Sequence, residues 1–184
     1  MKNELIILLI GQKGSGKSFV GSLLETEFKI KFIRVENWAK EIKQNRSIDD
    51  KTYLDEVFKA IETGIMKVAD YYNNICFEST GLTSQFDKML ESLRKGFNVV
   101  TIKIICDPEV CLERIKTRDR NIHINVSDDE IKRINTEVLK RNYKTDFELK
   151  NNSFNKDELI IELGVILKKI SVNISNNKEG NRLL

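Results

Sequence analysis

Residues 5–18 read LIILLIGQKGSGKS, an apolar run that passes directly into a glycine-rich turn. The last eight of these residues match the pattern G-x-x-x-x-G-K-[ST] at every fixed position. Gly11, Gly14 and Gly16 can adopt backbone angles that other residues avoid, so successive N–H groups of the turn can point toward a single anion. The stretch therefore predicts a buried strand, a phosphate-binding loop (P-loop) and the first turn of a helix.

The last two residues of the turn favour phosphate binding over a simple strand-to-helix connection. Lys17 is placed to supply a cation to the β- and γ-phosphates of a nucleotide, and the Ser18 hydroxyl is placed to ligate Mg²⁺. The dipole of the following helix adds to the attraction for phosphate. We expect the phosphates to be bound by the residues of the turn, which are Gly11, Gln12, Lys13, Gly14, Ser15, Gly16, Lys17 and Ser18.

The composition is that of one compact domain. The chain has 184 residues and a formal net charge of +3, which by itself calls for neither nucleic acid nor membrane. No apolar run approaches the length that spans a bilayer, and the run in residues 1–10 reads as a strand and not as a signal peptide. Cys76, Cys106 and Cys111 lack C-x-x-C spacing, which predicts reduced core residues in a cytoplasmic protein.

Five apolar runs alternate with stretches of helical periodicity. They lie near residues 4–10, 31–35, 74–78, 97–106 and 146–150. This alternation predicts a doubly wound α/β fold with a mainly parallel five-stranded sheet covered on both faces. Residues 37–73 predict a helical insert after the second strand. Residues 171–184 predict a polar, disordered tail behind a domain that spans residues 1–170.

Two carboxylates follow predicted strands at the edge of the sheet where the P-loop lies. Glu36 follows the second run, and Glu78 ends the third in the sequence ICFESTGL of residues 75–82. Ligands of such sheets bind beyond the carboxyl ends of the strands. Glu78 is therefore expected to hold Mg²⁺ through a water or to orient an attacking group. The alternative is that Glu78 caps the next helix, although Thr83 and Ser84 are themselves capping candidates.

Two arginines are spaced by one helical turn. Arg114 and Arg118 are four residues apart, so on a helix they share one face. Planar guanidinium groups can stack on a base and can bind phosphate oxygens with two hydrogen bonds. The alternative is a solvated face on which these arginines pair with Glu113 and Asp119.

Together these motifs resemble the P-loop kinases of the nucleoside-monophosphate-kinase type, a group that includes adenylate and shikimate kinases, zeta toxins and polynucleotide 5′-kinases. The resemblance rests on the P-loop, the strand that ends in Glu78 and the L-x-R-I-x-x-R sequence of residues 112–118, and it covers residues 4–170. The segment DFELKNNS of residues 146–153 is similar to the fifth strand of that family, after which the chain passes the adenine.

The resemblance implies ATP and Mg²⁺ as cofactors and assigns further roles by position. Arg114 would pack on the adenine, and Arg118 would reach the transferring phosphate from a lid formed by residues 119–126. Such a lid excludes water that would compete for the phosphoryl group. Glu36 would orient or deprotonate the acceptor hydroxyl, although the family more often has Asp there. The expected catalytic residues are thus Lys17, Glu36 and Arg118, with Ser18 and Glu78 at the metal.

Four other residues near these motifs have an ordinary interpretation. His123 is the only histidine and lies in the expected lid, where a single histidine is usually incidental. Trp38 could stack on the acceptor, but a lone Trp on a helix more often packs in the core. Arg34 and Arg46 could bind an anionic acceptor, and we favour surface charges for both.

The sequence thus predicts an ATP-dependent phosphotransferase that acts on a hydroxyl or phosphate of a small molecule. A polynucleotide or nucleotide-sugar kinase is an alternative, as is a non-catalytic ATP-binding module or NTPase. Nucleic acid is not favoured because no basic stripe is interleaved with aromatic residues. A GTPase switch is disfavoured because Glu78 replaces the Asp of its D-x-x-G motif, and the NKEG of residues 177–180 lacks the guanine-reading Asp. The identity of the acceptor and the oligomeric state are not predicted.

Overall fold

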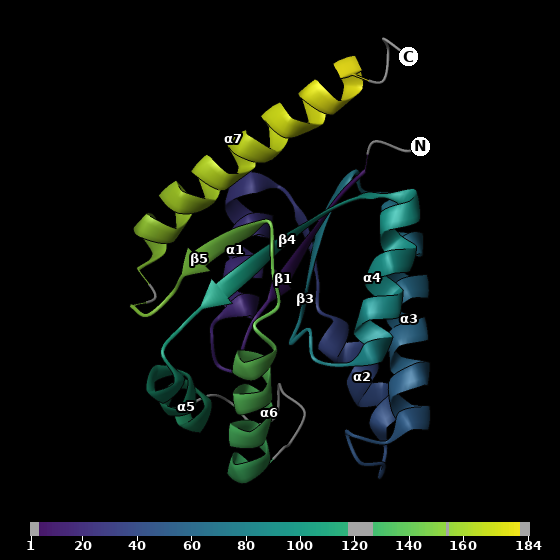
Figure 1. Cartoon of the computed structure of the whole chain (residues 1–184), viewed down its shortest axis with the longest axis vertical. Helices are drawn as coiled ribbons and strands as arrows, with labels where there is room; N and C mark the ends of the chain where they lie inside the picture. The colour runs from purple at the N-terminus through teal and green to yellow at the C-terminus, as the bar shows by residue number, and fades with distance from the viewer. Residues whose placement is uncertain (1–3, 118–126, 154, 181–184) are drawn as a thin grey trace.

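Five parallel strands form one sheet in the order β2-β3-β1-β4-β5 (Figure 1). The computed structural model describes residues 4–117, 127–153 and 155–180, with side chains in the last range up to Ser171. The strands are β1 (Leu5–Ile10), β2 (Lys31–Ile33), β3 (Asn74–Ser79), β4 (Asn98–Ile105) and β5 (Phe147–Lys150). The helices are α1 (Lys17–Phe28), α2 (Val35–Lys43), α3 (Lys51–Ala69), α4 (Ser84–Gly96), α5 (Pro108–Thr117), α6 (Asp128–Arg141) and α7 (Lys156–Gly180).

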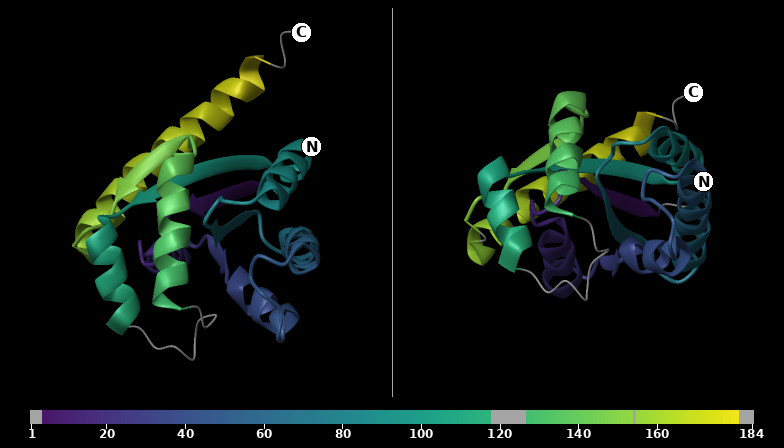
Figure 2. Two further views of the ribbon diagram at one scale, coloured as in Figure 1. Left: turned by 60° about the horizontal axis from the view of Figure 1, so that its bottom comes forward. Right: turned by 90° about the horizontal axis from the view of Figure 1, so that it is seen from below.

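The central strand β1 is buried along its whole length because helices cover both faces of the sheet. Its side chains alternate between two apolar cores. Ile6, Leu8 and Ile10 pack with α3 and α4, which lie side by side (Figures 1 and 2). Ile7 and Leu9 point to the other face and pack with α1 and α7. The predicted doubly wound, parallel α/β fold is confirmed.

The strand register brings the functional segments to one edge of the sheet. In the pairing of β1 with β3, Leu9 lies beside Glu78 and Ile10 lies beside Ser79. The P-loop therefore leaves β1 next to the point where β3 ends. Figure 1 shows α2, α5 and α6 at this same end of the molecule.

The segment after β2 departs from the prediction. The second strand was expected to reach residue 35, but β2 ends at Ile33 and α2 begins at Val35. Glu36 therefore lies in the first turn of a helix and not at the end of a strand. A carboxylate is favourable there because the helix dipole is positive at that end. The rest of the expected insert is helical, as α2 and α3.

The chain after residue 170 also differs from the expected irregular tail. Helix α7 continues through Ser171 as far as Gly180. The segment contains no proline, and Gly180 is the first glycine after Gly164, so nothing in its sequence interrupts helical hydrogen bonding earlier. Residues 181–184 lie outside the described part of the chain.

Two smaller expectations concern membrane spans and cysteines. Within the described ranges, none of the helices combines the length and apolar character that crossing a membrane requires. Cys76, Cys106 and Cys111 are all buried and free, as expected for core thiols. Burial raises the pKa of Cys76 well above its ordinary value and that of Cys111 to about 12, so both thiols are unreactive at neutral pH.

Candidate functional site

The P-loop closes tightly between β1 and α1. Gly14 has a φ of 85° and Gly16 a φ of 89°, both in the left-handed region. A β-carbon on Gly14 would also collide with the main-chain carbonyl of Cys111 in α5. Gly16 is the N-cap of α1 and supplies no side-chain cap. The first N–H groups of α1 are thus left to face a ligand.

Lys17 lies inside this loop and is 8% exposed. Its Nζ donates hydrogen bonds to the carbonyl oxygens of Gly11 at 3.0 Å and Gln12 at 2.7 Å. Burial lowers the pKa of Lys17, while the nearby charge of Glu78 opposes that effect. An entering phosphate would replace two neutral acceptors with charged ones and strengthen the contacts of this ammonium group.

Ser18 and Glu78 meet directly beside Lys17. The Ser18 hydroxyl donates to Glu78 Oε1 at 2.7 Å. The N-cap of α4 is Thr83, whose hydroxyl accepts from the N–H of Phe86 at 3.2 Å, so Glu78 is not needed as the cap of that helix. A hydroxyl and a carboxylate are hard oxygen ligands of the kind that Mg²⁺ takes alongside phosphate oxygens and water.

One cleft of about 380 Å³ is lined by most of the predicted residues. Glu36 lines it from α2, Glu78 from β3 and Arg114 from α5, together with the P-loop. Val35, Ala39 and Ile61 supply apolar walls on the side of α2 and α3. The cleft thus has a phosphate-binding side, formed by the P-loop, and an opposite side formed by α2 and α3, which we call the insert side.

Arg114 has partners that the sequence did not reveal. Its guanidinium donates to the carbonyl oxygens of Asn151 at 2.8 Å and Asn152 at 2.7 Å, and to Cys106 Sγ at 3.2 Å. Arg114 therefore joins α5 to the chain that follows β5, the segment expected to pass the adenine. These contacts fix the plane of the guanidinium at the wall of the cleft.

Arg118, His123 and the expected lid of residues 119–126 lie outside the described residues. Their roles stay as predictions.

Trp38, Arg34 and Arg46 each have contacts within the protein. The ring of Trp38 packs so closely on Gly64 of α3 that a β-carbon there would collide with it. Arg34 lies over the ring of Phe32 and donates to Ser22 Oγ at 3.3 Å. Arg46 pairs with Glu56 at 2.9 Å.

The sequence reasoning missed two buried asparagines that contact the P-loop. Asn135 of α6 is 5% exposed and bonds to both main-chain groups of Lys13. Asn151 is 2% exposed and donates to the carbonyl oxygen of Ser15 at 2.9 Å. A usable signal exists only for Asn135, because it interrupts the apolar face of α6 formed by Ile131, Ile134 and Val138.

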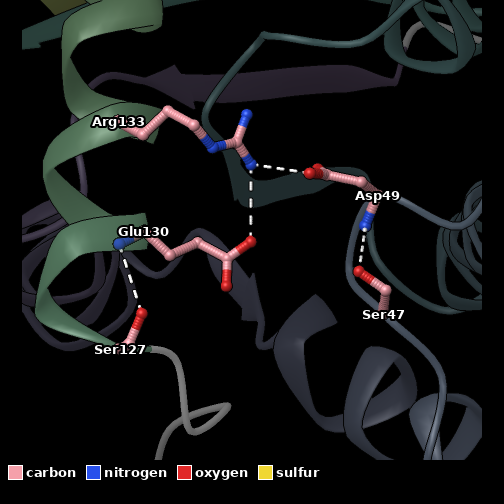
Figure 3. Close-up of polar contacts among 5 residues, drawn as sticks. All are labelled: Ser47, Asp49, Ser127, Glu130 and Arg133. Atoms are coloured by element: carbon pink, nitrogen blue, oxygen red, sulfur yellow. Dashed lines mark hydrogen bonds and ion pairs between the residues drawn. The ribbon is translucent and has the colours of Figure 1, made fainter.

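Helix α6 also contacts the insert side. Arg133 pairs with Asp49, in the loop between α2 and α3, at 2.6 Å, and with Glu130 at 3.4 Å (Figure 3). The hydroxyl of Ser127 accepts from the N–H of Glu130 and caps the helix. One helix thus touches the P-loop and the loop that joins the two helices of the insert side.

Comparison with known proteins agrees with this geometry. A family model described as an AAA domain matches residues 6–141. Shikimate kinase of Clostridium botulinum (strain Eklund 17B / Type B) is 32% identical over 116 residues, which are 60% of this chain and 68% of that protein.

Solved structures share the whole fold. The crystal structure of shikimate kinase from Aquifex aeolicus is 26% identical with a TM-score of 0.58, over 90% of this chain and 98% of that one. APS kinase of Mycobacterium tuberculosis, in complex with AMPPNP and APS, has a TM-score of 0.62 over 91% of this chain and 99% of that one, and at 13% identity it shows the fold alone. The chain therefore belongs to the AAA domain family and is an ATP-dependent P-loop kinase.

Proposed function

We propose that this kinase transfers the γ-phosphoryl group of ATP to a hydroxyl group of a small molecule bound on the insert side of the cleft. The observation that carries the proposal is the presence of Glu36, Glu78 and the P-loop in one cleft. A volume of about 380 Å³ is in the usual range of pockets for small molecules. A non-catalytic ATP-binding module would not need a carboxylate opposite the phosphates.

The roles follow from position. Lys17 binds the transferring phosphoryl group, because its ammonium already points into the loop. Ser18 and Glu78 would hold Mg²⁺, which would screen the charge that develops between the phosphates. Glu36 orients the acceptor hydroxyl and draws its proton as the oxygen attacks phosphorus. Arg114 packs on the adenine beside the chain after β5. Arg118 is proposed to stabilise the transferring group.

The Mg²⁺ site needs no further protein ligand. The described residues contain no group of three or more His, Cys, Asp or Glu side chains that could hold a metal by themselves. Mg²⁺ bound with a nucleotide keeps several waters and takes phosphate oxygens, so one hydroxyl and one carboxylate suffice. The Ser18–Glu78 hydrogen bond sets these two oxygens 2.7 Å apart.

A screen of acceptors tests the proposal. The protein would be incubated with Mg²⁺, ATP and single candidates, and phosphorylated products would be detected by mass spectrometry beside an acceptor-free hydrolysis control. Shikimate is the first candidate because of the named relatives, followed by adenosine phosphosulfate, neutral polyols and an oligonucleotide with a 5′-hydroxyl. Product from a small molecule that is lost in Lys17→Ala supports the proposal. Phosphorylation of the oligonucleotide alone would favour the polynucleotide alternative. ATP hydrolysis without any phosphorylated candidate would contradict the proposed transfer.

The domain boundary and the compartment complete the proposal. We place the catalytic domain in residues 1–170, since α7 packs into the core through Leu159, Leu163, Ile166 and Ile170. Three free, buried cysteines support a reducing compartment, the cytoplasm.

A further inference from the structure

The outer side of the P-loop is held by two side-chain amides from distant parts of the chain. Asn135 lies 122 residues from Lys13 in sequence, and Asn151 lies 136 residues from Ser15. Both asparagines are at least nine-tenths buried. An amide has a donor and an acceptor at fixed positions, so its contacts specify direction as well as distance.

Asn135 binds both main-chain groups of one P-loop residue. Its Oδ1 accepts from the N–H of Lys13 at 2.8 Å, and its Nδ2 donates to the carbonyl oxygen of Lys13 at 3.0 Å. The two bonds resemble a single rung of a β-ladder. They hold the Lys13 carbonyl on the side of the loop that faces α6.

Asn151 holds the peptide group between Ser15 and Gly16. Its Nδ2 donates to the carbonyl oxygen of Ser15 at 2.9 Å, while its main-chain carbonyl oxygen accepts from the Arg114 guanidinium at 2.8 Å. Its N–H donates to the carbonyl of Ile105 at 2.8 Å, so the backbone that carries it is fixed at the end of β4. The Ser15 carbonyl is thereby held on the outer side of the loop.

The geometry of the peptide unit determines which way the neighbouring N–H groups of the loop point. In a planar trans peptide the C=O and the following N–H point in opposite directions. A Lys13 carbonyl held outward therefore turns the N–H of Gly14 inward, and a Ser15 carbonyl held outward turns the N–H of Gly16 inward. Among the described residues, neither of these two N–H groups donates a hydrogen bond.

We propose that Asn135 and Asn151 are positioning residues that set the P-loop peptides so that the N–H groups of Gly14 and Gly16 face the phosphates before ATP arrives. The proposal rests on the phosphate-binding role proposed for the P-loop. Glycine at both positions allows other peptide orientations, so without the two amides part of the binding energy would be used to order the loop. The two asparagines then act on ATP affinity without touching ATP.

The first test compares Asn135→Asp with Asn135→Ala. The aspartate variant keeps the size of the side chain and its acceptor, but its carboxylate faces the Lys13 carbonyl and has no proton to donate. Calorimetry would measure binding of inorganic tripolyphosphate with Mg²⁺ at pH 8 and pH 5.5. We expect Asn135→Asp to bind it about tenfold more weakly at pH 8, the effect of one lost hydrogen bond. Burial at this position and the facing Lys13 carbonyl oxygen should raise the pKa of the new carboxyl, so much of that loss should disappear at pH 5.5, where the protonated carboxyl can donate again.

Asn135→Ala supplies the comparison that separates positioning from packing. It cannot regain a donor, so its weaker binding should be the same at both pH values after correction for the wild-type pH response. Thr136→Ala, at the next residue of α6, is the matched control, because Thr136 is exposed and its hydroxyl bonds only within the helix, to the Lys132 carbonyl. In steady-state kinetics the Asn135 variants should raise KM for ATP and leave KM for the acceptor unchanged.

A second pair extends the test to the other amide. Asn151→Ala should weaken tripolyphosphate binding, whereas Asn152→Ala should not, because the Asn152 side chain contacts Asp107 and not the P-loop. Wild-type protein that binds no tripolyphosphate would overturn the phosphate-binding role itself. If wild-type protein, Asn135→Asp and Asn151→Ala all bind tripolyphosphate equally tightly, that result would overturn only the positioning role. A thermal melt of each variant completes the set, since a loss of stability with unchanged affinity also contradicts positioning.

Discussion

The phosphate-binding side and the insert side of the cleft differ in how their residues are assembled. Gly11 to Ser18 come from one continuous turn, so their positions follow from local backbone geometry. On the insert side, Glu36 comes from α2 and Ile61 from α3, and Asp49 of the connecting loop is held by α6. A local motif therefore specifies where the phosphates bind, whereas tertiary packing shapes the place of the acceptor.

The largest expected effect comes from a substitution that alters the phosphate-binding side alone. Lys17→Ala should lower kcat by about a hundredfold or more, because it removes the cation that faces charge developing on the transferring group. The fold should survive, since burial lowers the pKa of Lys17 and its charge is a cost to the folded state. Turnover and a thermal melt would be measured beside Lys88→Ala, a change at an exposed lysine of α4. Near-normal turnover in Lys17→Ala would contradict its role.

The second prediction compares the two sides through their carboxylates. Glu36→Gln should lower kcat by about 10²-fold or more and leave ATP affinity unchanged, because it removes only the charge that draws the acceptor proton. Glu78→Gln should instead shift the Mg²⁺ concentration needed for half-maximal rate, because its partner is the metal. ATP binding by calorimetry and rates across a Mg²⁺ series would separate them. Weaker ATP binding in Glu36→Gln, or a Glu78→Gln protein with an unchanged Mg²⁺ response, would show that these roles are misassigned.

The same contrast explains what the sequence could predict. The strand, turn and helix of residues 5–28 are specified by neighbours in the chain, and all three form as expected. Glu36 was placed in the right cleft but on the wrong element, because Val35 suits a strand as well as the first residue of a helix. The main-chain partners of the Asn135, Asn151 and Arg114 side chains were not predictable, since these contacts join segments 37 or more residues apart.

A change at Gly64 should affect the insert side without touching the phosphate-binding side. Gly64→Ala puts a methyl group against the Trp38 ring, which must move away from α3. Overpacking of this kind costs about 1–3 kcal/mol of unfolding free energy. Gly96→Ala is the matched control, because a β-carbon there meets nothing within 4 Å, and it should be neutral or slightly stabilising. Urea unfolding gives both values, and equal stability of the two variants would contradict the packing of Trp38 on Gly64.

The smallest expected effect concerns the pair that joins α6 to the insert side. Arg133 is 50% exposed and Asp49 is 64% exposed, so solvent screens much of their attraction. A double-mutant cycle with Arg133→Gln and Asp49→Asn should give a coupling of about 0.2–1 kcal/mol in unfolding free energy, and it should weaken as salt is raised.

If the pair also orients the insert side, both single variants should raise KM for the acceptor by a similar small factor at low salt and leave KM for ATP unchanged. Glu137→Gln, which breaks the Lys140–Glu137 pair within α6, is the control that should leave both KM values unchanged. An acceptor KM that does not respond to any of these changes would mean that α6 serves the phosphate-binding side alone, through Asn135, and that the two sides of the cleft are positioned independently.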